Sequence, residues 1–253
     1  MTKNQALYEY ALRLGDTSLV LGHRLSEWCG HAPLLEEDIA LSNMALDLIG
    51  QSRLMLAYAG TLEGKGNDED ALAYHRDARQ YRNLLLAEQP NGDFGYTIAR
   101  HFLLSAYLVT LYQKLTKSSD ETLNGFAQKS LKEMIYHLRH ASDWMLRLGD
   151  GTPESKQRVQ ESLDACWLFT DDFFDADAVD AILQDGTAPD LADIKTTWLV
   201  TVTSVITLAG LQIPATTNGF MRSGSRKGNH TEYLGHLLAD MQFIPRAYPG
   251  TKW

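Results

Sequence analysis

Cysteine is scarce in this chain: its 253 residues include only Cys29 and Cys166. Two isolated thiols exclude a disulfide framework and a zinc-binding cysteine pattern. We expect both to be buried, reduced thiols, as in a cytosolic protein. Cys29 stands beside Trp28, but the sequence places no base next to it, so a small buried hydrophobe is favoured over a nucleophile.

Membrane-spanning runs and excess positive charge are missing as well. No apolar run looks long enough to cross a bilayer, and the first residues lead into a polar amphipathic segment rather than the apolar core of a signal peptide. The formal net charge of −9 argues against nucleic acid and anionic membranes as partners. With 44% hydrophobic and 22% charged residues, we expect a cytoplasmic globular protein.

Amphipathic segments of helical length fill most of the chain. Apolar spacing, capping residues and breakers predict helices at 4–29, 36–62, 69–87, 94–116, 120–148, 153–170 and 231–246. Gly15 and Gly22 either weaken the first helix or allow another helix to approach closely. Residues 217–229 read as a loop.

Residues 196–209 are ambiguous, because their many β-branched side chains favour a strand. No partner strand is visible elsewhere, so we interpret them as a helix. The sequence therefore predicts an all-α, single domain over 1–253. We expect a core bundle of long antiparallel helices at about 4–150 and a C-terminal helical extension at about 151–253.

The segment 132–148 contains a histidine in the middle of an apolar helix. Ile135, Leu138, Ala141 and Met145 recur every three or four residues and predict a buried face. In four-helix di-iron carboxylate proteins, such a helix carries Glu-x-x-His pointing into the core. Here Met134 occupies the position three residues before His137.

Seven blocks carry a resemblance to a known family. They are Leu-Arg-Leu-Gly-Asp (12–16), Glu-Trp-Cys-Gly-His-Ala-Pro (27–33), Leu-Asp-Leu-Ile-Gly-Gln (46–51), Glu-Gln-Pro-Asn-Gly-Asp-Phe (88–94), Tyr-His-Leu-Arg (136–139), Leu-Phe-Thr with Phe-Asp-Ala-Asp (168–177) and Gly-Asn-His-Thr-Glu-Tyr-Leu-Gly (228–235). Over nearly its full length the chain resembles the phenylacetyl-CoA monooxygenase (epoxidase) family, and within it the non-catalytic ferritin-like subunit. The resemblance implies a ferritin-like bundle.

The same resemblance carries the iron ligands of the catalytic sister subunit onto positions of this chain. They fall, in chain order, on Ser18, Leu48, Gln51, Ser105, Met134 and His137. Only the histidine is kept, and four carboxylates are lost. The resemblance therefore implies vestigial positions without metal, with no catalytic residue and no cofactor bound by this chain. A hydrogen-bonded core histidine is the favoured interpretation of His137.

A different metal site is the alternative. Asp47 and Gln51, and likewise Glu133 and His137, are four residues apart. Both acids precede the expected ligand by one position, which is a rotation of about 100° around a helix. They are therefore expected at the side of the core, as surface or interhelix acids.

Two charged segments have competing interpretations. The acidic stretch with Asp175 and Asp177 suggests calcium, but it lacks the glycine and terminal glutamate of an EF-hand loop, so a solvated acidic face is favoured. Basic side chains gather near residue 226, at Arg222, Arg226, Lys227 and His230. They read either as a contact for a CoA phosphate or an acidic partner, or as a flexible solvated loop.

The resemblance implies a structural subunit of a complex that epoxidises the ring of phenylacetyl-CoA. Its partners would be the homologous catalytic subunit with its di-iron centre, a small accessory subunit, and a reductase with NADPH, flavin and an iron–sulfur cluster. The isolated chain could form a homodimer. The alternatives are a stand-alone ferritin-like metal-dependent oxidase with atypical ligands, and a helical binding module outside this complex.

Overall fold

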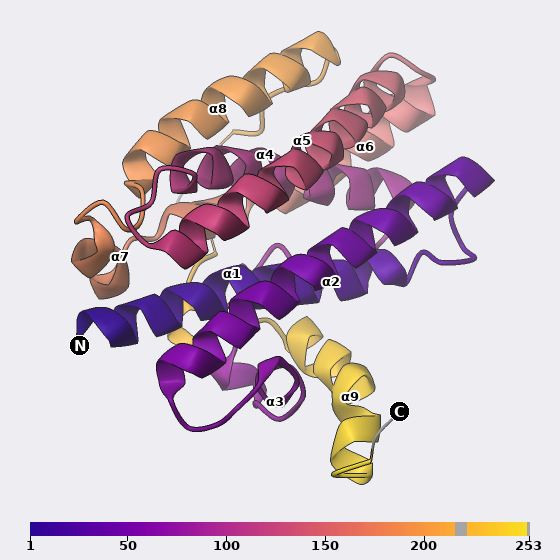
Figure 1. Ribbon diagram of the computed structural model, residues 1–253. Helices are drawn as coiled ribbons and strands as arrows, with labels where there is room; N and C mark the ends of the chain where they lie inside the picture. The colour runs from indigo at the N-terminus through magenta and orange to yellow at the C-terminus, as the bar shows by residue number, and fades with distance from the viewer. Residues whose placement is uncertain (216–221, 252–253) are drawn as a thin grey trace. The chain divides into compact units, whose positions relative to one another are not determined.

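The computed structural model describes residues 1–215 and 222–251 (Figure 1). Over these ranges the regular structure is helical and no strand occurs, which confirms the all-α, ferritin-like prediction. The chain divides into two compact units, which we describe separately: unit 1 holds 1–31, 38–90 and the segment from 224 on, and unit 2 holds 32–37 and 91–223. We expected a core bundle that ends near residue 150, but the segments of the two units alternate along the chain. The single domain stays a prediction.

Unit 1 is built on a helical hairpin. Helix α1 (Lys3–Ser26) begins at a capping box formed by Thr2 and Gln5, and it packs against α2 (Leu35–Glu63). A Cβ added at Gly15 would lie 2.8 Å from Leu56 Cδ2, and one added at Gly22 would lie 3.2 Å from Ile49 Cδ1. The two glycines thus allow a close antiparallel approach of α1 and α2, the second of the two interpretations offered above.

Shorter elements complete unit 1. They are α3 (Glu69–Tyr74), the 3-10 turns η1 (Ala78–Gln80) and η3 (Ser225–Lys227), and α9 (Glu232–Ala247). The helix expected over 69–87 is therefore wrong beyond Tyr74. Tertiary hydrogen bonds replace helical ones there: Arg82 N–H donates to Asp16 Oδ2 at 2.8 Å, and Leu84 N–H donates to Thr17 Oγ1 at 3.2 Å. Local periodicity does not reveal such partners.

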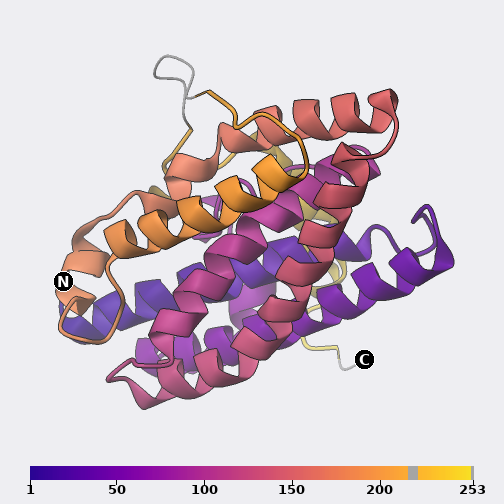
Figure 2. The same cartoon turned by 90° about the horizontal axis from the view of Figure 1, so that it is seen from above.

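Unit 2 is organised on a second hairpin, α4 (Phe94–Leu115) with α5 (Glu121–Gly149), seen from above in Figure 2. Aromatic ring pairs show that the two helices are antiparallel. The centroids of Phe94 and Trp144 are 4.9 Å apart, and those of Tyr112 and Phe126 are 5.1 Å apart. Around it lie α6 (Pro153–Trp167), η2 (Thr170–Phe174), α7 (Ala178–Leu183) and α8 (Leu191–Leu208). Trp198 of α8 donates its indole N–H to the Leu103 carbonyl at 3.0 Å and anchors α8 on α4.

The β-branched segment is helical, as predicted, and α8 begins five residues earlier than expected. Thr196, Thr201 and Thr203 donate their hydroxyls to carbonyls one turn earlier in the helix. Side-chain bonds of this kind satisfy the hydroxyls locally, so threonine is compatible with an α-helix here. Among the described helices, α8 has the length and composition of a membrane span, contrary to our expectation, although one such helix is weak evidence.

Three predictions about single side chains need correction. Cys29 is exposed, because α1 ends at Ser26 and the cysteine lies in the following turn, whereas Cys166 is buried as expected. Ile135 is 52% exposed, so the buried face of α5 runs along Met134, His137 and Met145 instead. In the acidic stretch, Asp172 and Asp180 are buried rather than solvated. The part of the loop at 217–221 lies outside the described residues.

Candidate functional site

Unit 1 holds three of the six positions onto which the resemblance carries the iron ligands. Ser18 lies on α1, and Leu48 and Gln51 lie on α2. Ser18 and Leu48 are fully buried and Gln51 is 2% exposed. These are the interior positions that the resemblance requires, and they carry a hydroxyl, an isobutyl group and an amide. None of the three side chains is an anion that could balance the charge of iron.

Unit 2 holds the other three positions. Ser105 on α4 and Met134 and His137 on α5 are all fully buried. The spacing of Met134 and His137 matches the Glu-x-x-His pattern, but a thioether replaces the carboxylate. Of the six carried-over positions, one imidazole is the only strong metal ligand.

The structure adds a buried histidine that the sequence reasoning missed. His101 on α4 is fully buried, and its ring centroid lies 5.1 Å from that of His137. Among the described residues, neither ring nitrogen of His101 has a hydrogen-bond partner. Desolvation, reinforced by His137, His140 and Arg100, lowers the pKa of His101 well below its usual value, so the ring is neutral. The spacing of four between His101 and Ser105 was the available signal, since it places both on one helix face.

The alternative metal site would draw on two acids. Asp47 and Glu133 are both partly exposed, at the sides of their helices, as the rotation of one residue predicts. Across residues 1–215 and 222–251, no group of three or more His, Cys, Asp or Glu is placed to hold a metal ion. A further histidine of α5, His140, is paired with Glu37, with 2.7 Å between His140 Nε2 and Glu37 Oε2.

The four basic residues do not form one surface cluster. Arg222 is exposed, with its guanidinium carbon 5.3 Å from the centre of the Phe169 ring, and Lys227 is exposed at the end of η3. Arg226 is buried, and the His230 side chain is 3% exposed. The predicted contact with a CoA phosphate or an acidic partner stays a prediction, and Arg222 and Lys227 are the two side chains on the surface that could make it.

His230 instead belongs to a buried network around Glu88, a residue from another of the seven blocks. The Glu88 carboxylate accepts hydrogen bonds from Asn83 at 2.8 Å, from His230 Nδ1 at 2.8 Å and from the Thr231 N–H at 2.6 Å. Burial alone lowers the pKa of His230, but its hydrogen bond and ion pair with Glu88 raise the pKa above the usual value. The network ties His230 and Thr231 to Glu88, so the His230 side chain is held within unit 1.

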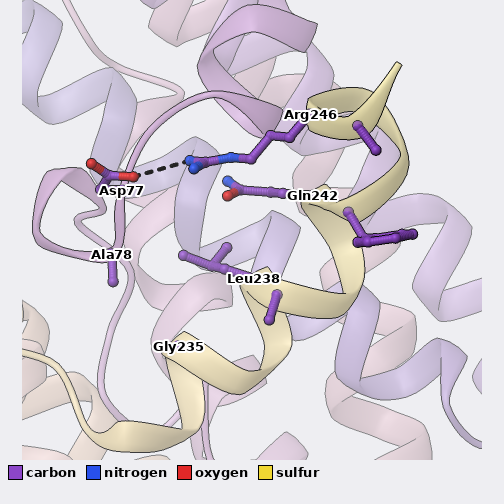
Figure 3. A pocket seen from close by; sticks show the side chains of 9 residues that line it. Asp77, Ala78, Gly235, Leu238, Gln242 and Arg246 are labelled. Atoms are coloured by element: carbon purple, nitrogen blue, oxygen red, sulfur yellow. Dashed lines mark hydrogen bonds and ion pairs between the residues drawn. The ribbon is translucent and has the colours of Figure 1, made fainter. Parts of the chain in front are cut away.

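A groove in unit 1 runs beside α9, with a volume of about 520 Å³ (Figure 3). Leu238 and Gln242 of α9 line it, and Arg246 reaches across to Asp77 at 3.1 Å. Gln242 donates to the carbonyls of Ala73 and Arg76. The lining residues offer an apolar wall and one carboxylate, that of Asp77, which is paired with Arg246.

Long antiparallel helical hairpins define a ferritin-like protein, and the six positions onto which the resemblance carries iron ligands hold no carboxylate. The chain belongs to the family described as phenylacetic acid catabolic protein, whose model matches residues 1–253. It is 48% identical over 248 residues to one subunit of the 1,2-phenylacetyl-CoA epoxidase of Escherichia coli (strain K12), covering 98% of this chain and 99% of that protein. The resemblance to the epoxidase family that the seven blocks carry is thereby confirmed, and the chain takes part in phenylacetate catabolism.

Proposed function

We propose that this chain is the structural, non-catalytic subunit of a phenylacetyl-CoA 1,2-epoxidase complex. It would pair with the homologous catalytic subunit and stabilise the active fold of that partner. The observation that carries the proposal is the burial of Ser18, Leu48, Ser105 and Met134, four neutral side chains at positions where the catalytic sister would hold carboxylates. Without those carboxylates, the interior lacks the hard oxygen ligands that a di-iron centre needs.

The cofactors would then belong to other subunits. The di-iron centre would reside in the catalytic partner, and a separate reductase would supply electrons from NADPH through flavin and an iron–sulfur cluster. A small accessory subunit completes the proposed complex, which we place in the cytoplasm. The similarity to a protein that is itself one subunit of an epoxidase supports an assembly of several chains.

Reconstitution tests the proposal. The catalytic sister subunit and the reductase are assayed for epoxidation of phenylacetyl-CoA with and without this chain, and the mixture is analysed by size-exclusion chromatography. We expect co-elution of the two ferritin-like chains and full turnover only when both are present. Full turnover by the catalytic subunit alone, with no co-elution, would contradict the proposal.

The same preparation addresses a stand-alone oxidase with atypical ligands. Such an enzyme would consume O2 in the presence of phenylacetyl-CoA and a reductant without the catalytic sister. We expect no O2 consumption above the buffer rate. His137→Ala in this chain should leave turnover of the assembled complex nearly unchanged, because we assign His137 no catalytic role.

A further inference from the structure

Helix α2 carries apolar side chains on two opposite faces. One face is buried in the chain, at Leu41, Met44, Leu48 and Met55. On the other face Ile39 is 54% exposed, Leu46 is 69% exposed and Leu54 is 42% exposed. Asn43 is exposed on the same side, so this face of α2 is predominantly rather than wholly apolar. The chain itself covers α2 on one side.

The exposed apolar residues lie in line. At about 100° per residue, Ile39, Leu46 and Ala57 fall within about 20° of one another around the helix. Gly50 and Leu54 continue the same side. We call Ile39, Leu46, Gly50, Leu54 and Ala57 the outer stripe of α2. Single exposed aliphatic side chains are common on protein surfaces, but an aligned row along one helix indicates an interface.

Gly50 supplies an independent observation. It lies inside the helix without a positive φ, and an added Cβ would meet no atom within 4 Å. Glycine weakens a helix interior, and neither backbone conformation nor packing within the chain requires it here. Gly15 and Gly22 differ, because another helix fills the space beside each of them. Gly50 is therefore a notch in the outer stripe with no occupant from this chain.

We propose that the outer stripe of α2 is the surface on which the catalytic sister subunit packs, with a partner helix seated at Gly50. This proposal rests on the proposed function, and it assigns the contact to particular residues. From Ile39 to Ala57 the stripe is roughly 27 Å long at 1.5 Å per residue, which suits a helix of about five turns. A stable complex buries about 800 Å² on each partner, more than one pair of helices provides, so a bundle fits the surface better than a single peptide.

The charges beside the stripe favour a different chain over a second copy. Asp47 borders the stripe on one side, and on the other Arg53 is paired with Glu69 at 3.0 Å. Two copies of this chain, each with a net charge of −9, would bring the same acidic borders together. The partner surface that fits is an apolar helix stripe flanked by lysine or arginine.

Two pairs of variants test the assignment by titration calorimetry against the catalytic sister subunit. Gly50→Leu fills the notch, and Gly125→Leu is its control, since Gly125 is also a helical glycine with no atom within 4 Å of an added Cβ. Leu46→Lys places a charge on the stripe, and Val200→Lys is its control on α8, where Val200 is 67% exposed. We expect at least a tenfold weaker Kd for Gly50→Leu and Leu46→Lys, and an unchanged Kd for both controls.

Thermal melting of each isolated variant separates lost binding from lost folding. Because a side chain at residue 50 meets nothing in the chain, we expect Gly50→Leu to melt at or above the wild-type temperature. Wild-type affinity in both stripe variants would overturn the assignment while leaving the proposed function intact. A wild-type chain that fails to bind the sister subunit would overturn both. Self-association of the wild type that Leu46→Lys abolishes would show that a second copy occupies the stripe, and would overturn the proposed occupant.

Discussion

Met134→Glu restores a carboxylate at a carried-over iron position and tests whether the interior tolerates it. Met134 is fully buried on α5, one turn before His137. Complete burial raises a carboxyl pKa by about 3 units. At about 1.4 kcal/mol per unit, we expect the ionised glutamate to lower the free energy of unfolding by about 4 kcal/mol, in addition to the lost packing of methionine.

The sign of the pH dependence follows from the raised pKa. The unfolded glutamate titrates near its ordinary value of about 4.3, and the folded one titrates higher. Stability of Met134→Glu should therefore fall as the pH rises from the unfolded to the folded pKa. Urea denaturation of the isolated chain at pH 5 and pH 8 measures this, and the loss relative to wild type should be greater at pH 8.

Two control variants isolate the charge. Met134→Gln has nearly the same shape without the charge and should show a pH-independent loss. Ile135→Glu places the same carboxylate one residue on, at a position that is 52% exposed, and should stay within about 0.5 kcal/mol of wild type. If Met134→Glu at pH 8 is as stable as Met134→Gln, the interior accommodates an anion, and the reasoning about its missing carboxylates is wrong.

Two buried groups lead to further predictions. The pKa of His101 is lowered in the folded chain. The contribution of its neutral ring to the free energy of unfolding is therefore complete above the unfolded-state pKa of about 6.5, and it is lost as the pH falls below that value. His101→Leu should flatten this acid loss in urea denaturation by up to about 1.4 kcal/mol per pH unit, and an unchanged slope would refute the assignment. Glu88→Gln should cost about 3–5 kcal/mol by leaving buried donors without their anion. Because the raised pKa of His230 makes that ion pair strongest below pH 6.5, the cost should be larger at pH 6 than at pH 9, and an equal cost at both would contradict the pairing.

Much of the fold could be predicted from local signals. The predicted helices at 94–116, 120–148 and 153–170 form, and their N-caps are Asp93, Asp120 and Thr152, because a side-chain oxygen before an apolar periodic run is a local feature. Ser105 and Met134, two positions onto which the resemblance carries iron ligands, are fully buried. These inferences needed only spacing along one helix or a match to known blocks.

Long-range pairing was out of reach of the sequence. Periodicity continued a helix past Tyr74, whereas Asp16 and Thr17 of α1 bind the backbone of that segment and hold it in an irregular path. His230 looked like part of a basic loop, but Glu88, far away in the chain, holds it in the interior. A charge cluster in sequence does not establish a charge cluster in space when each member has a distant partner.

Iron content tests the central claim most directly, namely that this chain is a ferritin-like subunit without a di-iron centre of its own. The chain expressed alone in iron-rich medium, and the complex with its catalytic sister subunit, are analysed for iron per polypeptide. We predict a negligible amount of iron in the chain alone and two iron ions per pair of subunits in the complex. Two iron ions per chain in the protein purified alone would contradict the account.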